Sequence, residues 1–199
     1  MPETLKKMVE RVRDILKEPI PARWTDEQIK GYLNRGQENL AILAERTKTV
    51  EITLPAGEGS IVRPDDFLMI KGLYWLDAPY KREIKPGMSN IPLDDTTVGD
   101  PRYFYMQNEK FEIRPIPVID RTIYVVYYQR PPDMEMDEDL PFFKFSEDVL
   151  VSFAVFRAYA EDNDPRMQLW EEDYYKQSRR WLVTETQNYQ EPFQQLPNW

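Results

Sequence analysis

The sequence contains neither cysteine nor histidine among its 199 residues. Without cysteine the chain has no disulfide, thiolate nucleophile, zinc–thiolate site or iron–sulfur cluster. Without histidine it has no imidazole base, no Ser-His-Asp triad and no imidazole metal ligand. Glycine occurs seven times, about half its usual share, and the sequence has no GxGxxG or GxxxxGK[ST] pattern for holding phosphates. A catalytic role would have to rest on carboxylates, lysine, tyrosine or serine. Since no constellation of these residues stands out, we expect a protein that is not an enzyme and uses no metal or cofactor.

Positive charge is also scarce, with 26 basic side chains against 35 acidic ones and a net charge of −9. No cluster of lysine and arginine could neutralise a series of phosphates, which argues against tight binding of nucleic acid. No apolar run approaches the roughly 18 residues of a membrane span, and charged residues occupy the start of the chain, where a signal peptide is apolar. We expect a protein made and kept in the cytoplasm, or in an assembly built there.

Proline is abundant, and its placement divides the chain. Most of the 17 prolines fall between residues 55 and 141, whereas the flanking stretches have few. Because proline is excluded from helix interiors, the flanking stretches are the expected helices. Thr25 and Gln28 form a capping-box pattern at the start of one of them. Gly36 interrupts the apolar stripe of that helix and leaves room for a neighbouring helix.

The central stretch changes to the two-residue period of strands. Alternating apolar residues predict strands at 50–54 and 122–128, and an apolar run predicts a buried strand at 67–76. Segments 103–106 and 111–114 predict a hairpin, and residues 86–101 predict a long loop. We expect an α+β fold in which a helical bundle built from both chain ends carries an inserted antiparallel β lobe and an extended C-terminal tail. The expected divisions are 1–46, 47–132, 133–187 and 188–199.

An acidic stretch precedes the third expected helix, which Ser146 is predicted to cap. Its acidic residues are Asp133, Glu135, Asp137, Glu138 and Asp139. The first three fit the opening ligand positions of a calcium loop, but the sixth position is Glu138 rather than Gly and the twelfth is Lys144 rather than Glu. The stretch is therefore interpreted as a solvated loop, with a contact to a basic partner as the alternative.

The last expected helix carries carboxylates and cations on its outer face. Glu171 and Asp173 lie beside aromatic residues, as in some sugar-binding sites, but residues of one helix cannot easily oppose each other across a substrate. Arg179 and Arg180, with Lys176, are interpreted as solvated charges or as salt-bridge partners between subunits.

The C-terminal residues 188–199 combine four large apolar side chains with two prolines. Those side chains are Tyr189, Phe193, Leu196 and Trp199. Proline reduces the entropy lost when an extended segment is ordered. Two interpretations remain open: the segment wraps over its own domain, or it docks on a neighbouring chain. The long loop at 86–101 is expected to be functional or disordered, as loops longer than about 12–15 residues usually are.

Four stretches of the sequence resemble the head-to-tail adaptor, or connector, proteins of tailed bacteriophages. They are residues 24–41; residues 50–59 with 63–67; residues 101–105, 111–115 and 123–132; and residues 140–141 with 147–162 and the helix that follows. The first resembles the family's "W-T-D-x-E-L…L-N-x-A-Q" helix, except that Gly36 stands where a small alanine is expected. The stretches occur in the family's order over nearly the whole chain.

The resemblance implies a structural virion protein that assembles, in the host cytoplasm, as a ring of twelve copies at the head–tail interface. Its partners would be other copies, the portal protein and a tail tube, hub or nozzle protein, with genomic DNA passing through during ejection. Arg179, Arg180 and the four apolar residues of the C-terminal segment would contact the portal or a neighbouring subunit. Asp94, Asp95, Asp100 and Pro101 would face the tail, and the five acidic residues of the 133–139 loop would border the channel or the tail.

Two other function classes remain alternatives from the sequence. A carbohydrate-binding or glycan-hydrolysing protein would depend on Glu171 or Asp173, so glycan turnover lost on their replacement would favour it. A monomeric regulatory module would copurify with a host factor and would form no ring with the portal.

Overall fold

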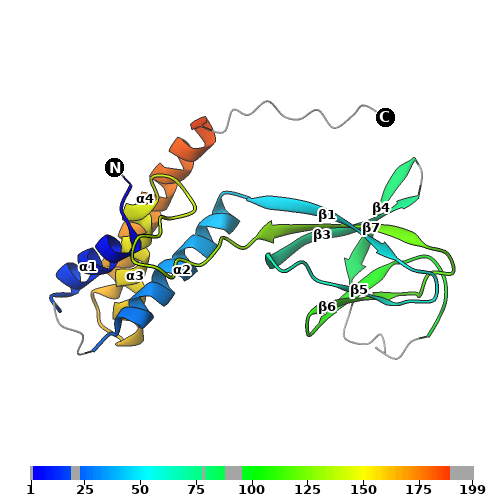
Figure 1. The fold of residues 1–199 in the computed structure, drawn as a ribbon, viewed down its shortest axis with the longest axis horizontal. Helices are drawn as coiled ribbons and strands as arrows, with labels where there is room; N and C mark the ends of the chain where they lie inside the picture. Colours follow the sequence, from blue (N-terminus) through cyan, green and yellow to red (C-terminus); the bar gives the residue numbers. More distant parts are fainter. Residues whose placement is uncertain (1, 19–22, 78, 88–95, 189–199) are drawn as a thin grey trace. The chain divides into compact units, whose positions relative to one another are not determined.

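The chain folds into two compact units, which are described separately. A computed structural model describes residues 2–18, 23–77, 79–87 and 96–188 (Figure 1). One unit contains residues 1–45 and 131–199, and the other is Arg46–Arg130. We call them the helical unit and the β unit.

Within its described residues the helical unit has four helices. They are α1 (Leu5–Leu16), α2 (Asp26–Leu43), α3 (Glu147–Glu161) and α4 (Met167–Asn188). The capping box predicted for α2 is confirmed: the Gln28 backbone N–H donates to the Thr25 hydroxyl, and the Gln28 side chain accepts from the Thr25 backbone N–H. Asp164 satisfies a backbone N–H before α4 by accepting from Arg166 at 2.9 Å. The cap predicted at Ser146 is wrong, because its hydroxyl donates instead to the Phe143 carbonyl.

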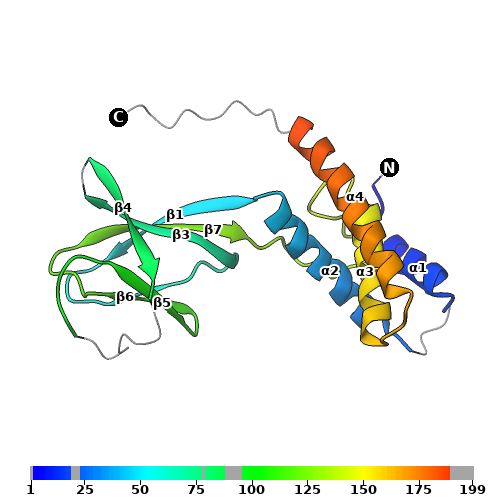
Figure 2. The same ribbon diagram turned by 180° about the vertical axis from the view of Figure 1, so that it is seen from behind.

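Helix α3 lies between α2 and α4 and is the buried centre of this unit (Figures 1 and 2). Nine of its 15 residues are buried, on almost every side of the helix. Gly36 of α2 allows the close approach, since a Cβ atom there would lie 2.9 Å from Leu150 and 3.2 Å from Phe153. The room that the sequence predicts at Gly36 is therefore filled by α3.

The β unit contains seven strands among its described residues. They are β1 (Thr47–Leu54), β2 (Ser60–Val62), β3 (Phe67–Asp77), β4 (Tyr80–Pro86), β5 (Tyr103–Gln107), β6 (Lys110–Arg114) and β7 (Arg121–Gln129). Their order in the sheet is β1-β7-β3-β4-β5-β6-β2. The outermost strands β1 and β2 also contact each other, so the sheet is nearly closed and barrel-like.

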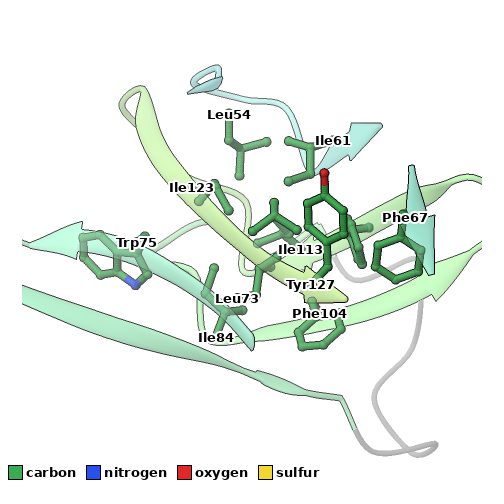
Figure 3. Close-up of a cluster of buried hydrophobic side chains, with 12 residues drawn as sticks. Leu54, Ile61, Phe67, Leu73, Trp75, Ile84, Phe104, Ile113, Ile123 and Tyr127 are labelled. Atoms are coloured by element: carbon green, nitrogen blue, oxygen red, sulfur yellow. The ribbon is translucent and has the colours of Figure 1, made fainter. Parts of the chain in front are cut away.

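Strand β7 lies between β1 and β3, and its alternating pattern explains this place. Ile123, Val125 and Tyr127 point inward and are fully buried, whereas the residues between them stay partly exposed. They join a core of twelve buried side chains contributed by all seven strands. Figure 3 shows these side chains converging inside the curved sheet. The β unit thus has a hydrophobic core of its own.

The predicted fold, a helical bundle from both ends with an inserted antiparallel lobe, is corrected by these findings. The chain is a mixed α+β protein with a seven-stranded, nearly closed, barrel-like sheet and four helices; only the coarse α+β class holds. Strands β4 and β5 are parallel, so the sheet is not purely antiparallel. A parallel connection cannot be a tight hairpin, and the long loop predicted at 86–101 lies in this crossover. The predicted C-terminal tail lies beyond the described residues.

Candidate functional site

Helix α4 has one face fixed by packing and one face turned outward. Tyr174, Ser178 and Trp181 are buried. The Tyr174 ring lies 5.1 Å from the ring of Phe153 in α3, and the Trp181 indole N–H donates to the Lys144 carbonyl at 3.0 Å. These contacts set the rotation of α4 about its axis and so determine which residues face away.

The outward residues form what we call the α4 outer face: Leu169, Tyr175, Lys176, Arg179 and Arg180. All five are exposed, and four of them line a shallow depression of about 460 Å³ together with Glu172. Within the described parts of the chain, Lys176, Arg179 and Arg180 make no ion pair. The α4 outer face therefore combines apolar surface with three positive charges that form no ion pair among the described residues, beside the carboxylate of Glu172.

The acidic loop, residues 133–139, is more ordered than a solvated loop requires. Its carbonyls at Asp139 and Asp137 accept hydrogen bonds from the backbone N–H groups of Leu5 and Lys6, at 2.8 and 3.1 Å. They thereby satisfy the start of α1, where the side chain of Thr4 makes no capping bond. The loop is thus part of the packing of the helical unit.

Helix α2 holds the other side of the acidic loop through two amide side chains. Asn34 donates to the Met134 carbonyl and accepts from the Met134 N–H, at 3.1 and 2.9 Å. Gln37, only 1% exposed, accepts from the Phe142 N–H at 2.7 Å and donates to the Pro132 carbonyl. Sequence reasoning missed both anchors; the available signal was a pair of amides one turn apart beside the apolar stripe of α2.

The carboxylates of the acidic loop fall into two groups. The backbone N–H groups of Met136 and Glu135 both donate to Asp139 and lower its pKa, and Asp137 lies 3.7 Å from Lys30. Asp133, Glu135 and Glu138 are exposed and have no cationic partner among the described residues. In the same part of the chain, no three acidic side chains are grouped to hold a metal ion.

The residues predicted to face the tail fall only partly within the structure. Asp100 pairs with Arg121 at 2.6 Å, and the Pro101 carbonyl accepts from the buried Trp75 indole at 3.1 Å. Both therefore also brace the β unit. They line a hollow of about 260 Å³ whose other residues include Arg82, Lys85 and Arg102. Asp94 and Asp95 lie outside the described residues.

The remaining predicted site residues are placed as follows. Asp173 accepts from the Ser152 hydroxyl at 2.6 Å, which joins α4 to α3 and leaves it pointing into the unit rather than toward a substrate opposite Glu171. The four apolar residues of the C-terminal segment, Tyr189, Phe193, Leu196 and Trp199, lie outside the described residues. The structure therefore brings both surfaces into one unit: the acidic loop is bonded to α1 and α2, and the outer face belongs to α4.

The sequence model of the SU10 adaptor protein family matches residues 3–195. The chain belongs to the SU10 adaptor protein family. The adaptor resemblance seen in the sequence is thereby confirmed. As an SU10 adaptor the chain is a bacteriophage structural protein and a virion component. No curated protein matches the chain. Over the described residues, none of the helices has the length and apolar character needed to span a membrane.

Proposed function

We propose that this SU10 adaptor forms a ring of twelve copies that bridges the portal and the tail and surrounds the DNA channel. The observation that carries the proposal is the family match over residues 3–195, nearly the whole chain. Its role is structural: the ring connects the portal to the tail and catalyses no reaction.

The distribution of charge supports this proposal. The β unit has 12 basic and 12 acidic side chains, so the helical unit, with 14 basic and 23 acidic ones, carries the entire net charge of −9. A negative surface repels the phosphates of DNA. An acidic ring lining would therefore let the genome pass without holding it.

The C-terminal segment is the proposed contact with the portal or the neighbouring subunit. Its four apolar side chains and two prolines suit an extended segment docked on another chain. A chain lacking residues 188–199 is expected to lose docking to portal-containing particles. Unchanged docking of that variant would refute this assignment. The loop around Asp94 to Pro101 is correspondingly proposed to face the tail.

The test is electron microscopy of the purified protein mixed with portal-containing particles. The expected result is an added layer with twelve-fold symmetry beneath the portal. Particles without an added layer would overturn the proposal, and copurification with a host factor instead would favour a monomeric regulatory module. The oligomeric state of the free protein does not decide the matter, because a ring that assembled only on the portal would leave the free protein monomeric.

A further inference from the structure

We propose that the α4 outer face of one copy binds the acidic loop of a second copy, so that neighbouring copies join through two different surfaces. This inference rests on the proposed ring and names the surfaces that close it. Its occupant is a second copy of this chain rather than the portal.

Charge complementarity is the first argument. Lys176, Arg179 and Arg180 are exposed without a carboxylate partner in the described chain, although their unit carries a net charge of −9. The acidic loop offers three carboxylates in the same condition, at Asp133, Glu135 and Glu138. The two surfaces of each copy thus offer three cations and three anions that form no ion pair among the described residues, and contact between copies would pair them.

Both surfaces also expose apolar side chains beside their charges. On α4, Leu169 and Tyr175 are 66% and 54% exposed; on the loop and just after it, Met136 and Leu140 are 68% and 50% exposed. Interfaces that hold together combine a buried apolar centre with a polar rim. The proposed contact has both parts on each side.

The two surfaces lie on different elements of the helical unit. The acidic loop is bonded to α1 and α2 through Leu5, Lys6 and Asn34, whereas α4 packs its buried face against α3 (Figures 1 and 2). Over the described residues, no ion pair joins the two surfaces within one copy. A contact between two different surfaces of identical subunits is heterologous, and it closes into a ring when the rotation permits.

The acidic loop is held in place before any partner binds. Two backbone N–H groups of α1 donate to its carbonyls, two bonds from Asn34 hold Met134, and Gln37 holds the flanking Pro132 and Phe142. A preformed surface loses less conformational entropy on binding. The bonds from α1 and α2 that hold the loop therefore favour the proposed contact.

The test is charge reversal in the full chain, read as the fraction of portal-containing particles that carry a complete adaptor layer. R179E/R180E and E135R/E138R are each expected to lower this fraction about tenfold or more, because like charges then face each other. Combining all four substitutions in one chain is expected to restore the layer, since every contact again pairs opposite charges. The matched control is K7E/K110E, which reverses two exposed lysines outside both surfaces and should leave the layer intact.

A second readout uses the natural absence of cysteine. Under oxidising conditions on particles, E138C/R179C is expected to give a ladder of disulfide-linked multimers, whereas K7C/R179C should stay monomeric. If the variant with all four substitutions does not restore the layer, the inference is overturned and the proposed function stands. The same holds if E138C/R179C forms a layer but gives no ladder of linked multimers. If the unaltered protein adds no layer, the proposed function fails and this inference fails with it.

Discussion

Gly36 and Gly31 lie on the same helix but in opposite surroundings. A Cβ atom at Gly31 would have no neighbour within 4 Å, whereas one at Gly36 would press on the buried Leu150 and Phe153. Gly31→Ala should stabilise the protein by about 0.5–1 kcal/mol through helix propensity. Gly36→Ala gains the same propensity but overpacks the α2–α3 contact, at a cost of about 1–3 kcal/mol.

Chemical denaturation of the two variants measures this difference directly. We expect Gly31→Ala to raise the free energy of unfolding and Gly36→Ala to lower it. Equal stabilisation by both substitutions would show that α2 and α3 do not approach closely at Gly36.

Asp66 provides a pH-dependent prediction in the β unit. Partial burial would raise its pKa, but hydrogen bonds from Lys48, Tyr127 and Gln129 lower the pKa overall, below the ordinary 3.8. A carboxyl with a lowered folded-state pKa stabilises the fold above its ordinary pKa and loses that contribution as the pH falls through the folded value. Tyr127→Phe should therefore destabilise the protein by about 1–2 kcal/mol at pH 7, and by less near pH 2.

Tyr128→Phe is the matched control for this substitution. The Tyr128 hydroxyl forms no hydrogen bond with the described residues, so its removal should change stability little at either pH. Urea unfolding of the three proteins at pH 7 and pH 2 provides the measurement. A Tyr127→Phe effect that is the same at both values would rule out Asp66 as the cause.

Residue-scale features were predictable where the determinants are local. The Thr25–Gln28 capping box depends on four consecutive residues, and the sequence alone predicts it correctly. Ser146 matches the same preference, yet its hydroxyl donates to the Phe143 carbonyl, because the preceding loop turns back on itself. A neighbouring turn outweighs a cap preference that contributes only about 1 kcal/mol.

At the scale of elements, the acidic loop depends on α2 for its conformation. Asn34 satisfies both backbone groups of Met134 from 100 residues away in the sequence. Asn34→Ala should leave those groups unpaired and destabilise the helical unit by about 1–3 kcal/mol. Hydrogen exchange should quicken most at residues 133–139.

Asn39→Ala on the same helix separates loop anchoring from helix propensity. The Asn39 amide donates only to the Arg35 carbonyl of its own helix. Faster exchange of the acidic loop in Asn39→Ala as well would mean that the loop does not depend specifically on Asn34.

Strands were predictable where buried and exposed residues alternate along the sequence. Strand β7 alternates strictly and was predicted almost to its ends, since both of its neighbours in the sheet bury the same face. Strand β4 was missed because only Ile84 among its seven residues is buried, so its charged sequence has no two-residue period. Its parallel pairing with β5 depends on a crossover that local sequence does not encode.

At the scale of the whole molecule, the β unit should fold by itself. It has its own core, and the Gln129 N–H donates to the Arg46 carbonyl at 2.9 Å, so its two ends are adjacent. An isolated Arg46–Arg130 fragment is expected to show the circular dichroism of a β protein and a cooperative thermal transition. A fragment that stays unfolded would show that the core needs the helical unit.

The candidate site was only partly predictable at this scale. Arg179, Arg180 and the acidic residues of 133–139 were recognised as surface charges from composition. Their relation to each other depends on α3, which packs between distant parts of the chain, and no local pattern states which side of α3 each will occupy. The family, in contrast, was recognisable because its helix and strand patterns persist along nearly the whole chain.

The placement of α3 has a consequence for synthesis on the ribosome. Helices α1 and α2 emerge first, but their packing partner α3 follows the 85 residues of Arg46–Arg130. At roughly 5–20 residues per second, α2 waits several seconds while the β unit is translated. Helix α4 emerges last of the four, after the acidic loop. A nascent chain therefore presents both of the surfaces proposed to join copies only when translation of α4 is finished.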